Sequence, residues 1–332
     1  MMKLQVAFLQ LPISFDADAL AAEIAALSES AWRPHPQGFA GNSAIPLVAR
    51  GGDASSDAVS GPMQPTPQLL ACPKLMQTMA AIGGVWGRSR LMRLSGNAEV
   101  QSHVDVDYYW REHIRVHVPI VTQPEVRFEC GRSAIHMAAG ECWIFDTWDR
   151  HRVLNSAERS RIHLVADTVG GPGFWDLIAG ARVPNGGPTG WQAHRYAFEA
   201  GVKPTLAYES TNVPTVMTPW EVKEHLTFAL DDALPHPRLG EVQQLVGHFA
   251  RHWRSLWAEY GESQDGFSDY RVALDNLMTA LKQVANGIVL ENGTPLAHAM
   301  RRLVIDVAVN ERGDETMADE RSSLNAGGSL TT

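Results

Sequence analysis

Hydrophobic and polar positions change their spacing three times along the chain. From residue 4 to about residue 94, short β-type runs alternate with helical patterns, and residues 18–28 and 68–81 are predicted to be helices. From residue 89 to residue 169, segments rich in Val, Ile, Trp and Phe recur about every 10 residues between Gly, Asn or Asp. Such spacing is typical of a β-sandwich or jelly roll.

After residue 169 the pattern becomes helical. Thr218, followed by Pro219 and Glu221, predicts a helix start, and the ranges 241–260, 270–284 and 295–309 are predicted to be helices. We therefore expect a mixed α+β protein with a jelly-roll core, N-terminal helices and a C-terminal helical region. The expected divisions are 1–170 for the β domain with its N-terminal elements, 171–310 for the mainly helical region, and 311–332 for a polar, disordered tail.

Composition narrows the class of protein. The chain has 332 residues, 45% of them hydrophobic, which is enough to fill at least one core. Its formal charge of −9 argues against nucleic-acid and anionic-membrane partners, and no apolar run reaches the roughly 18–20 residues that span a bilayer. The N-terminus lacks the features of a secretory signal, and three cysteines without a Cys-x-x-Cys pair indicate reduced thiols. We expect a cytoplasmic protein.

Metal-binding residue types follow one another after residue 102. Because side chains alternate along a strand, His103, Asp105 and Asp107 would share one face. A histidine and a carboxylate two residues apart can reach a single metal ion, and a third ligand must come from elsewhere. The shorter chelate favours Asp105, while Asp107 remains a competing ligand. Two histidines and one carboxylate are the set that binds ferrous iron and leaves positions open for co-substrates.

Basic residues lie on several of the predicted strands. Arg115 and His117 lie opposite an apolar face that begins at Ile114, and Arg161 and His163 alternate with apolar residues in the same way. On a single strand such a stripe is most simply a solvated face. Basic residues on four separate strands, with His151 at the start of one of them, instead favour an anionic partner, and one dianion would satisfy them.

Together these residues resemble the aspartyl/asparaginyl β-hydroxylase family. The similarity covers roughly residues 89–170 and is carried by motifs that occur in the same order: His103-x-Asp105, Arg115-x-His117 with Pro119, Gly140-Glu141-x-Trp143, Phe145-Asp146, His151 with Asn155, and Arg161-Ile162-His163-Leu164. The stretch between His103 and Arg115 is longer than in the family pattern. Some family members have glycine in place of the metal-binding carboxylate, so the presence of Asp105 is closer to the amino-acid hydroxylases.

The resemblance implies a fold and a reaction. The fold would be a double-stranded β-helix, cupin-like, and the activity that of an Fe(II)- and 2-oxoglutarate-dependent dioxygenase. It would use dioxygen to hydroxylate an unactivated C–H of an amino acid, free or in a peptide, with release of succinate and CO2. His103, Asp105 and His151 would bind the iron, Arg161 the distal carboxylate of 2-oxoglutarate, and Arg115 and His117 would be further contacts to that co-substrate.

Other residues and other functions stay open at this point. Six aromatic residues could line a substrate pocket, although core packing accounts for at least half of them: Tyr108, Tyr109, Trp110, Trp143, Phe145 and Trp148. Arg93, Arg127 and Arg132 could meet a substrate carboxylate, whereas His113, His136 and His163 are more simply structural histidines. The alternative functions are a cupin-type oxygenase that does not use 2-oxoglutarate and a non-catalytic jelly-roll binding or sensor protein. A buried Arg161 would argue against the first, because without a dicarboxylate co-substrate its guanidinium would have no partner. Three intact metal ligands are hard to reconcile with the second.

Overall fold

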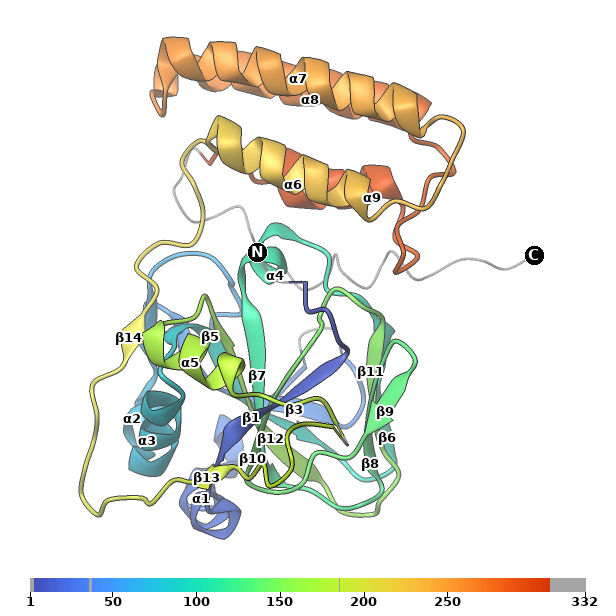
Figure 1. Ribbon diagram of the computed structural model, residues 1–332. Helices are drawn as coiled ribbons and strands as arrows, with labels where there is room; N and C mark the ends of the chain where they lie inside the picture. Colours follow the sequence, from blue (N-terminus) through green and yellow to red (C-terminus); the bar gives the residue numbers. More distant parts are fainter. Residues whose placement is uncertain (1–2, 36–37, 185, 311–332) are drawn as a thin grey trace. The chain divides into compact units, whose positions relative to one another are not determined.

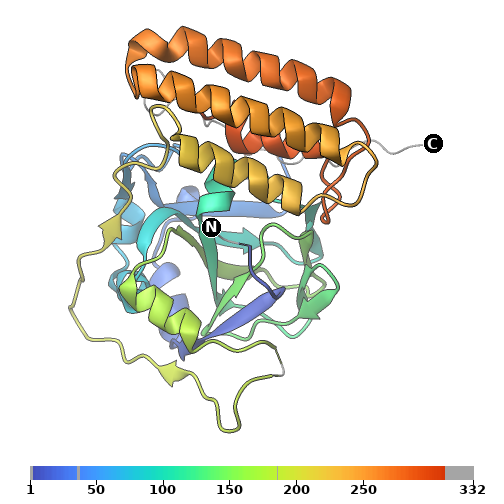
Figure 2. The same ribbon diagram turned by 45° about the horizontal axis from the view of Figure 1, so that its top comes forward.

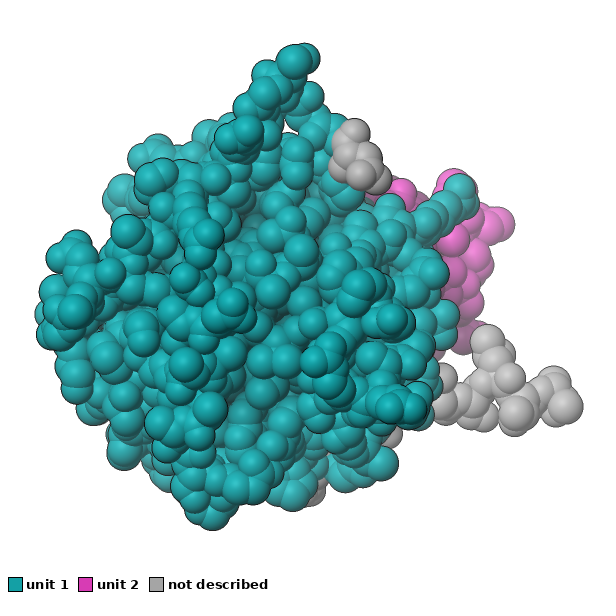
Figure 3. All heavy atoms as spheres, turned by 90° about the horizontal axis from the view of Figure 1, so that it is seen from below, with its two compact units in different colours: residues 1–105, 112–210, 319–332 teal, residues 106–111, 211–318 magenta. Residues whose placement is uncertain are grey.

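The structure is a computed structural model, and it describes residues 3–35, 38–184 and 186–310. Contacts between residues divide the described chain into two compact units, coloured separately in Figure 3. Of the described residues, unit 1 holds those up to 105 and 112–210, and unit 2 holds 106–111 and 211–310. Each unit is described by itself below.

Unit 1 is built on two β-sheets (Figure 1). The main path of the larger sheet runs β13 (His194–Arg195), β1 (Phe8–Ser14), β10 (Glu141–Phe145), β7 (Ile114–Val121), β12 (Arg161–Thr168), β5 (Val85–Leu94), β3 (Asn42–Arg50) and β2 (Arg33–Pro34). Two short strands lie off this path, β4 (Met63–Pro65) beside β3 and β14 (Ala207–Tyr208) beside β5. The smaller sheet has the order β6 (Ala98–His103), β11 (His151–Asn155), β8 (Val126–Cys130) and β9 (Ser133–Ile135).

From β5 to β12 the chain passes repeatedly between the two sheets. β5, β7, β10 and β12 lie in the larger sheet, and β6, β8, β9 and β11 lie in the smaller one. The strand orders are β10-β7-β12-β5 in the larger sheet and β6-β11-β8-β9 in the smaller one. Among these eight strands β8 and β9 form a hairpin, and all other consecutive strands lie in different sheets. This is the strand order of a double-stranded β-helix, so the predicted jelly-roll, cupin-like core is confirmed.

The two faces of the larger sheet bury different cores. Ile114, Val116, Val118 and Ile120 of β7 belong to a core shared with helices on the outer face. Those helices are α1 (Ala17–Ile24), α2 (Pro67–Leu70), α3 (Pro73–Ile82) and α5 (Pro172–Ala179). A second core, with residues from β1, β5, β8, β10 and β11, lies between the two sheets. Because β7 alternates, Arg115 and His117 point toward this inner side.

The single helix predicted over 68–81 is wrong in one respect, because the structure has two. α2 begins after Thr66, whose hydroxyl accepts from the Leu69 N–H at 3.3 Å, and it ends before Cys72. Pro73 then occupies the first turn of α3. Proline has no N–H to donate and clashes with the preceding turn, so a helix cannot continue through it, whereas it fits well at a helix start.

Unit 2 consists mainly of helices (Figure 2). They are α4 (Tyr108–Glu112), α6 (Pro219–Asp231), α7 (Leu239–Tyr260), the 3-10 turn η2 (Gln264–Gly266), α8 (Phe267–Val284), α9 (Leu296–Met300) and the π-helical turn η3 (Arg301–Ile305). Thr218 caps α6 as predicted, since its hydroxyl accepts from the Glu221 N–H at 3.2 Å. Trp253 of α7 packs against Tyr270 of α8 with ring centroids 4.6 Å apart and ring planes tilted by 47°, inside the helical core.

Residues 171–210 group with the sheets, although the sequence division was placed at residue 170. The reason is physical: β13 pairs with β1, β14 pairs with β5, and Phe174 of α5 is buried in the outer core. The predicted disordered tail, 311–332, lies outside the described residues. The three cysteines are free and buried, and the cytoplasmic location stays a prediction. None of the described helices has the length and apolarity needed to cross a bilayer.

Candidate metal centre

Strand pairing in the smaller sheet brings two of the predicted ligands together. His103 is the last residue of β6, His151 is the first residue of β11, and the two lie directly opposite each other. Their ring centroids are 4.2 Å apart, and the register of the two strands shifts immediately beyond this pair. Such bulges re-aim side chains and are common beside functional sites. The sheet thus presents two imidazoles at one end.

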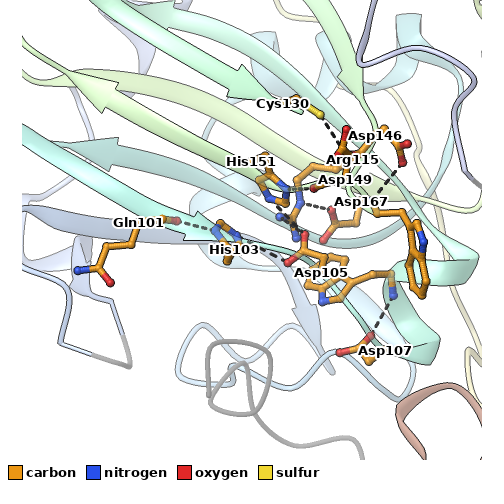
Figure 4. A network of polar contacts seen from close by, with 12 residues as sticks. Gln101, His103, Asp105, Asp107, Arg115, Cys130, Asp146, Asp149, His151 and Asp167 are labelled. Carbon is orange, nitrogen blue, oxygen red and sulfur yellow. Dashed lines mark hydrogen bonds and ion pairs between the residues drawn. The ribbon is translucent and has the colours of Figure 1, made fainter. Parts of the chain in front are cut away.

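Asp105 completes the group from the segment that follows β6. Its backbone N–H donates to the Thr147 carbonyl at 3.2 Å, which fixes the chain beside the turn that precedes β11. Its carboxylate oxygens lie 3.8 Å from His103 Nε2 and 3.9 Å from His151 Nε2. One ligand atom from each of the three residues lies within 4.8 Å of the others (Figure 4).

Both imidazoles are held in the form that a metal needs. His103 Nδ1 lies 2.8 Å from the Gln101 carbonyl and His151 Nδ1 lies 2.9 Å from the Asp149 carbonyl. A carbonyl oxygen can only accept, so each Nδ1 carries a proton, and in the neutral tautomer with this proton the lone pair is on Nε2. His151 Nε2 is buried and has no hydrogen-bond partner. These contacts orient both Nε2 atoms as ligands.

Electrostatics keeps His151 neutral. Burial lowers the pKa of this imidazole well below its usual value, and the positive charge of Arg115 lowers it further. A neutral imidazole is the form that binds a metal. Two oriented Nε2 atoms, one carboxylate and an orphaned buried nitrogen fit a 2-His-1-carboxylate site for ferrous iron.

Asp107 is committed elsewhere. β6 ends at His103, so the strand alternation that would place Asp107 beside Asp105 does not continue. Asp107 Oδ1 accepts from the Trp110 N–H at 3.1 Å and so caps α4, and Oδ2 lies 3.5 Å from Arg302. Figure 4 shows its side chain apart from the three ligands. The geometry therefore favours Asp105 as the carboxylate ligand.

Arg115 lies at the metal-ligand group but is already engaged by two carboxylates. Its Nη1 donates to Asp105 Oδ2 and its Nε donates to Asp167 Oδ1, both at 3.0 Å. Asp167 is the residue directly opposite Arg115 in the β7–β12 pairing. The guanidinium thus bridges a predicted iron ligand and a neighbouring strand.

Arg161 is in the opposite situation. Its side chain is buried, and its Nε and Nη1 have no hydrogen-bond partner. Burial lowers the pKa of Arg161 to about 10, which still leaves the guanidinium charged at neutral pH. A buried charge without a partner is strongly unfavourable, so this group is set to receive an anion.

Two more buried histidines stand near Arg161. His117 Nδ1 and His163 Nδ1 are 3.4 Å apart, and the Nε2 of each lacks a partner. Burial lowers the pKa of both imidazoles well below the usual value, and Arg161 lowers them further. Both are therefore neutral and can share one hydrogen bond. His163 was interpreted as structural from the sequence, and its place on the same face of β12 as Arg161 was the signal that it belongs to the site.

The rings between these groups form an apolar wall. Phe145 lies 4.8 Å from His151 and 5.4 Å from His117, measured between ring centroids, and Phe128 of β8 also contacts His117. Sequence reasoning named Phe145 but missed Phe128, because only the pairing of β8 with β11 brings it inside. Tyr108, Tyr109 and Trp110 belong to unit 2, and Trp143 and Trp148 are buried in unit 1.

The arginines considered for a substrate carboxylate lie away from the group. Arg93 pairs with Glu29 at 2.7 Å, and Arg127 and Arg132 are exposed. Arg88 and Arg90 of β5, which the sequence did not single out, are buried instead. Arg90 lies opposite Val165, so it shares the inner face of the sheet with Arg161 and His163.

Comparison with known proteins finds a family similarity for part of the chain. Residues 21–170 match the model of the aspartyl/asparaginyl beta-hydroxylase family. The predicted resemblance is confirmed, and the matched segment contains His103, Asp105, His151 and Arg161. Comparison with curated proteins gives no match. The hydroxylase-family match supports a hydroxylase enzyme as the general class.

Solved structures with similar folds include enzymes and cupins. A prolyl-4-hydroxylase from Pseudomonas putida is 16% identical, with 49% of this chain and 92% of that chain covered and a TM-score of 0.34. A 2OG-Fe(II) oxygenase family oxidoreductase from Burkholderia pseudomallei is 14% identical, with 46% and 80% covered and a TM-score of 0.33. A cupin domain from Bordetella pertussis is 14% identical, with 24% and 79% covered and a TM-score of 0.20.

Proposed function

We propose that this protein is an Fe(II)- and 2-oxoglutarate-dependent dioxygenase that hydroxylates an unactivated C–H of an amino acid, free or within a peptide. The observation that carries the proposal is the convergence of His103, Asp105 and His151, with both Nε2 atoms oriented as ligands by backbone carbonyls. The hydroxylase-family match over 21–170 supports the same reaction class.

Bound iron and 2-oxoglutarate would supply the oxidation, in which dioxygen converts 2-oxoglutarate to succinate and CO2 while a substrate C–H becomes C–OH. His103, Asp105 and His151 hold the iron in this proposal. Their roles are to keep two neutral imidazoles and one carboxylate in place before the metal arrives, so that little ordering is needed on binding.

Arg161 binds the distal carboxylate of 2-oxoglutarate in this proposal. A planar guanidinium matches a carboxylate in bidentate geometry, and Arg161 is buried with free donors at Nε and Nη1. The neutral His117 is a further contact, and His163 beside it extends the same polar patch. The predicted contact from Arg115 competes with the two ion pairs that this residue makes with Asp105 and Asp167.

The wall of Phe128 and Phe145 keeps water away from the group. Both rings are buried and contact the imidazoles of His117 and His151. Exclusion of water strengthens the electrostatic contacts inside and limits side reactions of a strong oxidant. The substrate C–H that lies nearest the metal would then be the one attacked, since positioning decides the site of reaction.

The test is anaerobic titration of the metal-free protein with Fe(II) and then 2-oxoglutarate. We expect a weak visible charge-transfer band that appears only when both are bound, and succinate on admission of air, measured by mass spectrometry. His151→Ala should abolish iron binding and the band. His136→Ala, which removes a histidine outside the group, should keep both.

Two outcomes separate the alternatives. Iron binding without the band or succinate would contradict the use of 2-oxoglutarate and leave a cupin-type oxygenase. Failure of the wild-type protein to bind iron would contradict the enzyme proposal altogether and favour a non-catalytic binding protein.

A further inference from the structure

Asp105 has few constraints of its own. It lies beyond the last residue of β6, and the backbone bond that holds it is the one from its N–H to the Thr147 carbonyl. The histidine ligands differ, because each sits in a strand and is fixed by a bond from its second ring nitrogen. A ligand carboxylate in a connecting segment needs a hydrogen bond from another group to fix its orientation.

Arg115 supplies that group. Its Nη1 donates to Asp105 Oδ2 at 3.0 Å while Oδ1 lies 3.8 Å from His103 Nε2. The side chains of Arg115, Asp105 and Asp167 expose 11%, 6% and 3% of their surfaces, so water screens these pairs poorly. Arg115 therefore holds one carboxylate oxygen of Asp105, while the other oxygen faces the imidazole of His103.

Asp167 in turn fixes Arg115. The bond from Arg115 Nε to Asp167 Oδ1 is 3.0 Å long, and the two residues are paired across β7 and β12 in the larger sheet. A guanidinium that donates hydrogen bonds from both Nε and Nη1 has the orientation of its plane fixed by two partners. The chain of contacts thus links the rigid larger sheet to the ligand in the connecting segment.

Arg115 and Arg161 differ in the charged groups that surround their guanidinium groups. Arg115 faces two carboxylates, whereas Arg161 is buried without a hydrogen-bond partner at Nε or Nη1. A dianion placed on Arg115 would also approach the negative charges of Asp105 and Asp167. Coulomb repulsion at such range in a buried site is large, so an anionic co-substrate is better received at Arg161.

We propose that Arg115 is a positioning residue that holds Asp105 ready as the carboxylate ligand, with Asp167 holding Arg115, and that it is not a contact to 2-oxoglutarate. This inference rests on the proposed function, because it assumes that the group of His103, Asp105 and His151 binds a metal. It differs from the role that the family resemblance implies for Arg115.

The experiment measures metal affinity separately from co-substrate affinity. Wild type, Arg115→Gln, Arg115→Lys and Asp167→Asn are titrated anaerobically with Fe(II), and with Co(II), whose visible d–d spectrum reports coordination. 2-Oxoglutarate is then titrated at saturating metal. Arg152→Gln is the matched control, since Arg152 of β11 lies next to His151 but pairs with Glu129 in a far more exposed position.

We expect Arg115→Gln to weaken metal binding by about 10–100-fold, the usual effect of losing a partner of a metal ligand, and to change the Co(II) spectrum. Asp167→Asn, which contacts neither the metal nor Asp105, should weaken metal binding by a smaller factor. Arg115→Lys should recover part of the loss, because one ammonium keeps the charge but not the two-sided fork. 2-Oxoglutarate affinity at saturating metal should stay near the wild-type value, as should all properties of Arg152→Gln.

The inference is overturned if Arg115→Gln binds metal like wild type, and most clearly if it loses 2-oxoglutarate affinity instead. If Arg115→Gln fails to fold, Asp167→Asn and Arg115→Lys decide the matter, because unchanged metal affinity in both contradicts the chain of contacts. A wild-type protein that binds no metal would defeat the proposed function itself, which these variants do not address.

Discussion

At the scale of single residues, several polar side chains on the inner face of the larger sheet lower the stability of the folded protein. Arg161, His117 and His163 are buried, and each has a polar side-chain atom with no hydrogen-bond partner among the residues that the structure describes. Leaving such groups unpaired costs roughly 1–3 kcal/mol each, and more for a charge. Buried groups that lower stability in this way occur mainly at functional sites. These three residues therefore indicate a bound ligand rather than a role in core packing.

Replacing Arg161 should therefore change stability and function in opposite directions. Arg161→Met removes the buried charge and fills similar volume, so we expect the free energy of unfolding of the metal-free protein to rise by about 1–3 kcal/mol, as when buried ionic groups are replaced by apolar ones. The same variant should lose the 2-oxoglutarate-dependent band. Urea denaturation at pH 7.5 measures the first effect. Arg152→Met, at an exposed position, is the control, and a clear loss of stability in Arg161→Met would contradict this account of its burial.

At the scale of elements, one turn positions two of the three proposed ligands. The turn between β10 and β11 supplies the Thr147 carbonyl to the Asp105 N–H and the Asp149 carbonyl to His151 Nδ1. The turn is organised by Asp146, whose Oδ1 accepts from the Trp148 N–H at 3.1 Å. Burial raises the pKa of this carboxyl to about 6, with the charge of Asp149 adding to the rise.

The raised pKa of Asp146 predicts a pH dependence of stability. Between its ordinary pKa of 3.8 and the folded value of about 6, the folded state binds more protons than the unfolded state, so this group makes stability fall as pH rises through that window. Asp146→Asn keeps an acceptor for Trp148 and removes the titration. At pH 8 we expect the variant to be more stable than wild type by about 3 kcal/mol, at 1.36 kcal/mol per pKa unit.

The difference should shrink as the pH falls and approach zero below about pH 3, where Asp146 is protonated in both states of the wild type. Urea denaturation of both proteins at pH 4, 6 and 8 tests this, since the difference cancels the histidines that also titrate in this range. A difference that does not depend on pH would show that the buried carboxyl does not titrate as described.

Alternation within strands was sufficient to predict much of this site. The alternation along β7 correctly predicts which side of this strand faces inward: Ile114 and Val116 lie on the outer face, and Arg115 and His117 on the inner face. A strand with one apolar face can pack in one orientation only. Asp107 was placed wrongly on the shared face, since no local signal marks the end of β6 at His103. The pairing of Arg115 with Asp167 depends on the register of β7 and β12, which are 52 residues apart at this pair, and so lies beyond sequence pattern.

At the scale of the whole molecule, the chain that leaves Asp105 enters unit 2 at the next residue. Residues 106–111 are held by contacts within that unit. Tyr108 donates to Glu221 of α6 at 2.6 Å, the Arg111 guanidinium lies 3.6 Å from the ring centroid of Phe228, and Asp107 pairs with Arg302. Order in the helical unit is thus transmitted through the backbone to the residue next to a proposed ligand.

This continuity predicts that loosening unit 2 weakens metal binding without touching any ligand. Arg302→Gln removes the ion pair with Asp107, and we expect faster amide exchange at 106–111, measured by mass spectrometry. Metal affinity should fall by about 2–10-fold, within the usual range of coupling between distant residues. Arg238→Gln is the control, because that ion pair with Glu241 lies on the surface of the same unit.

Faster exchange at 106–111 with unchanged metal affinity would contradict the link, because Asp105 would then be held by Arg115 and Thr147 alone. The two mechanisms can be told apart in the double variant of Arg115 and Arg302. If both residues act on the same carboxylate, their effects on metal affinity should not add, whereas independent routes should give the sum of the two free-energy changes.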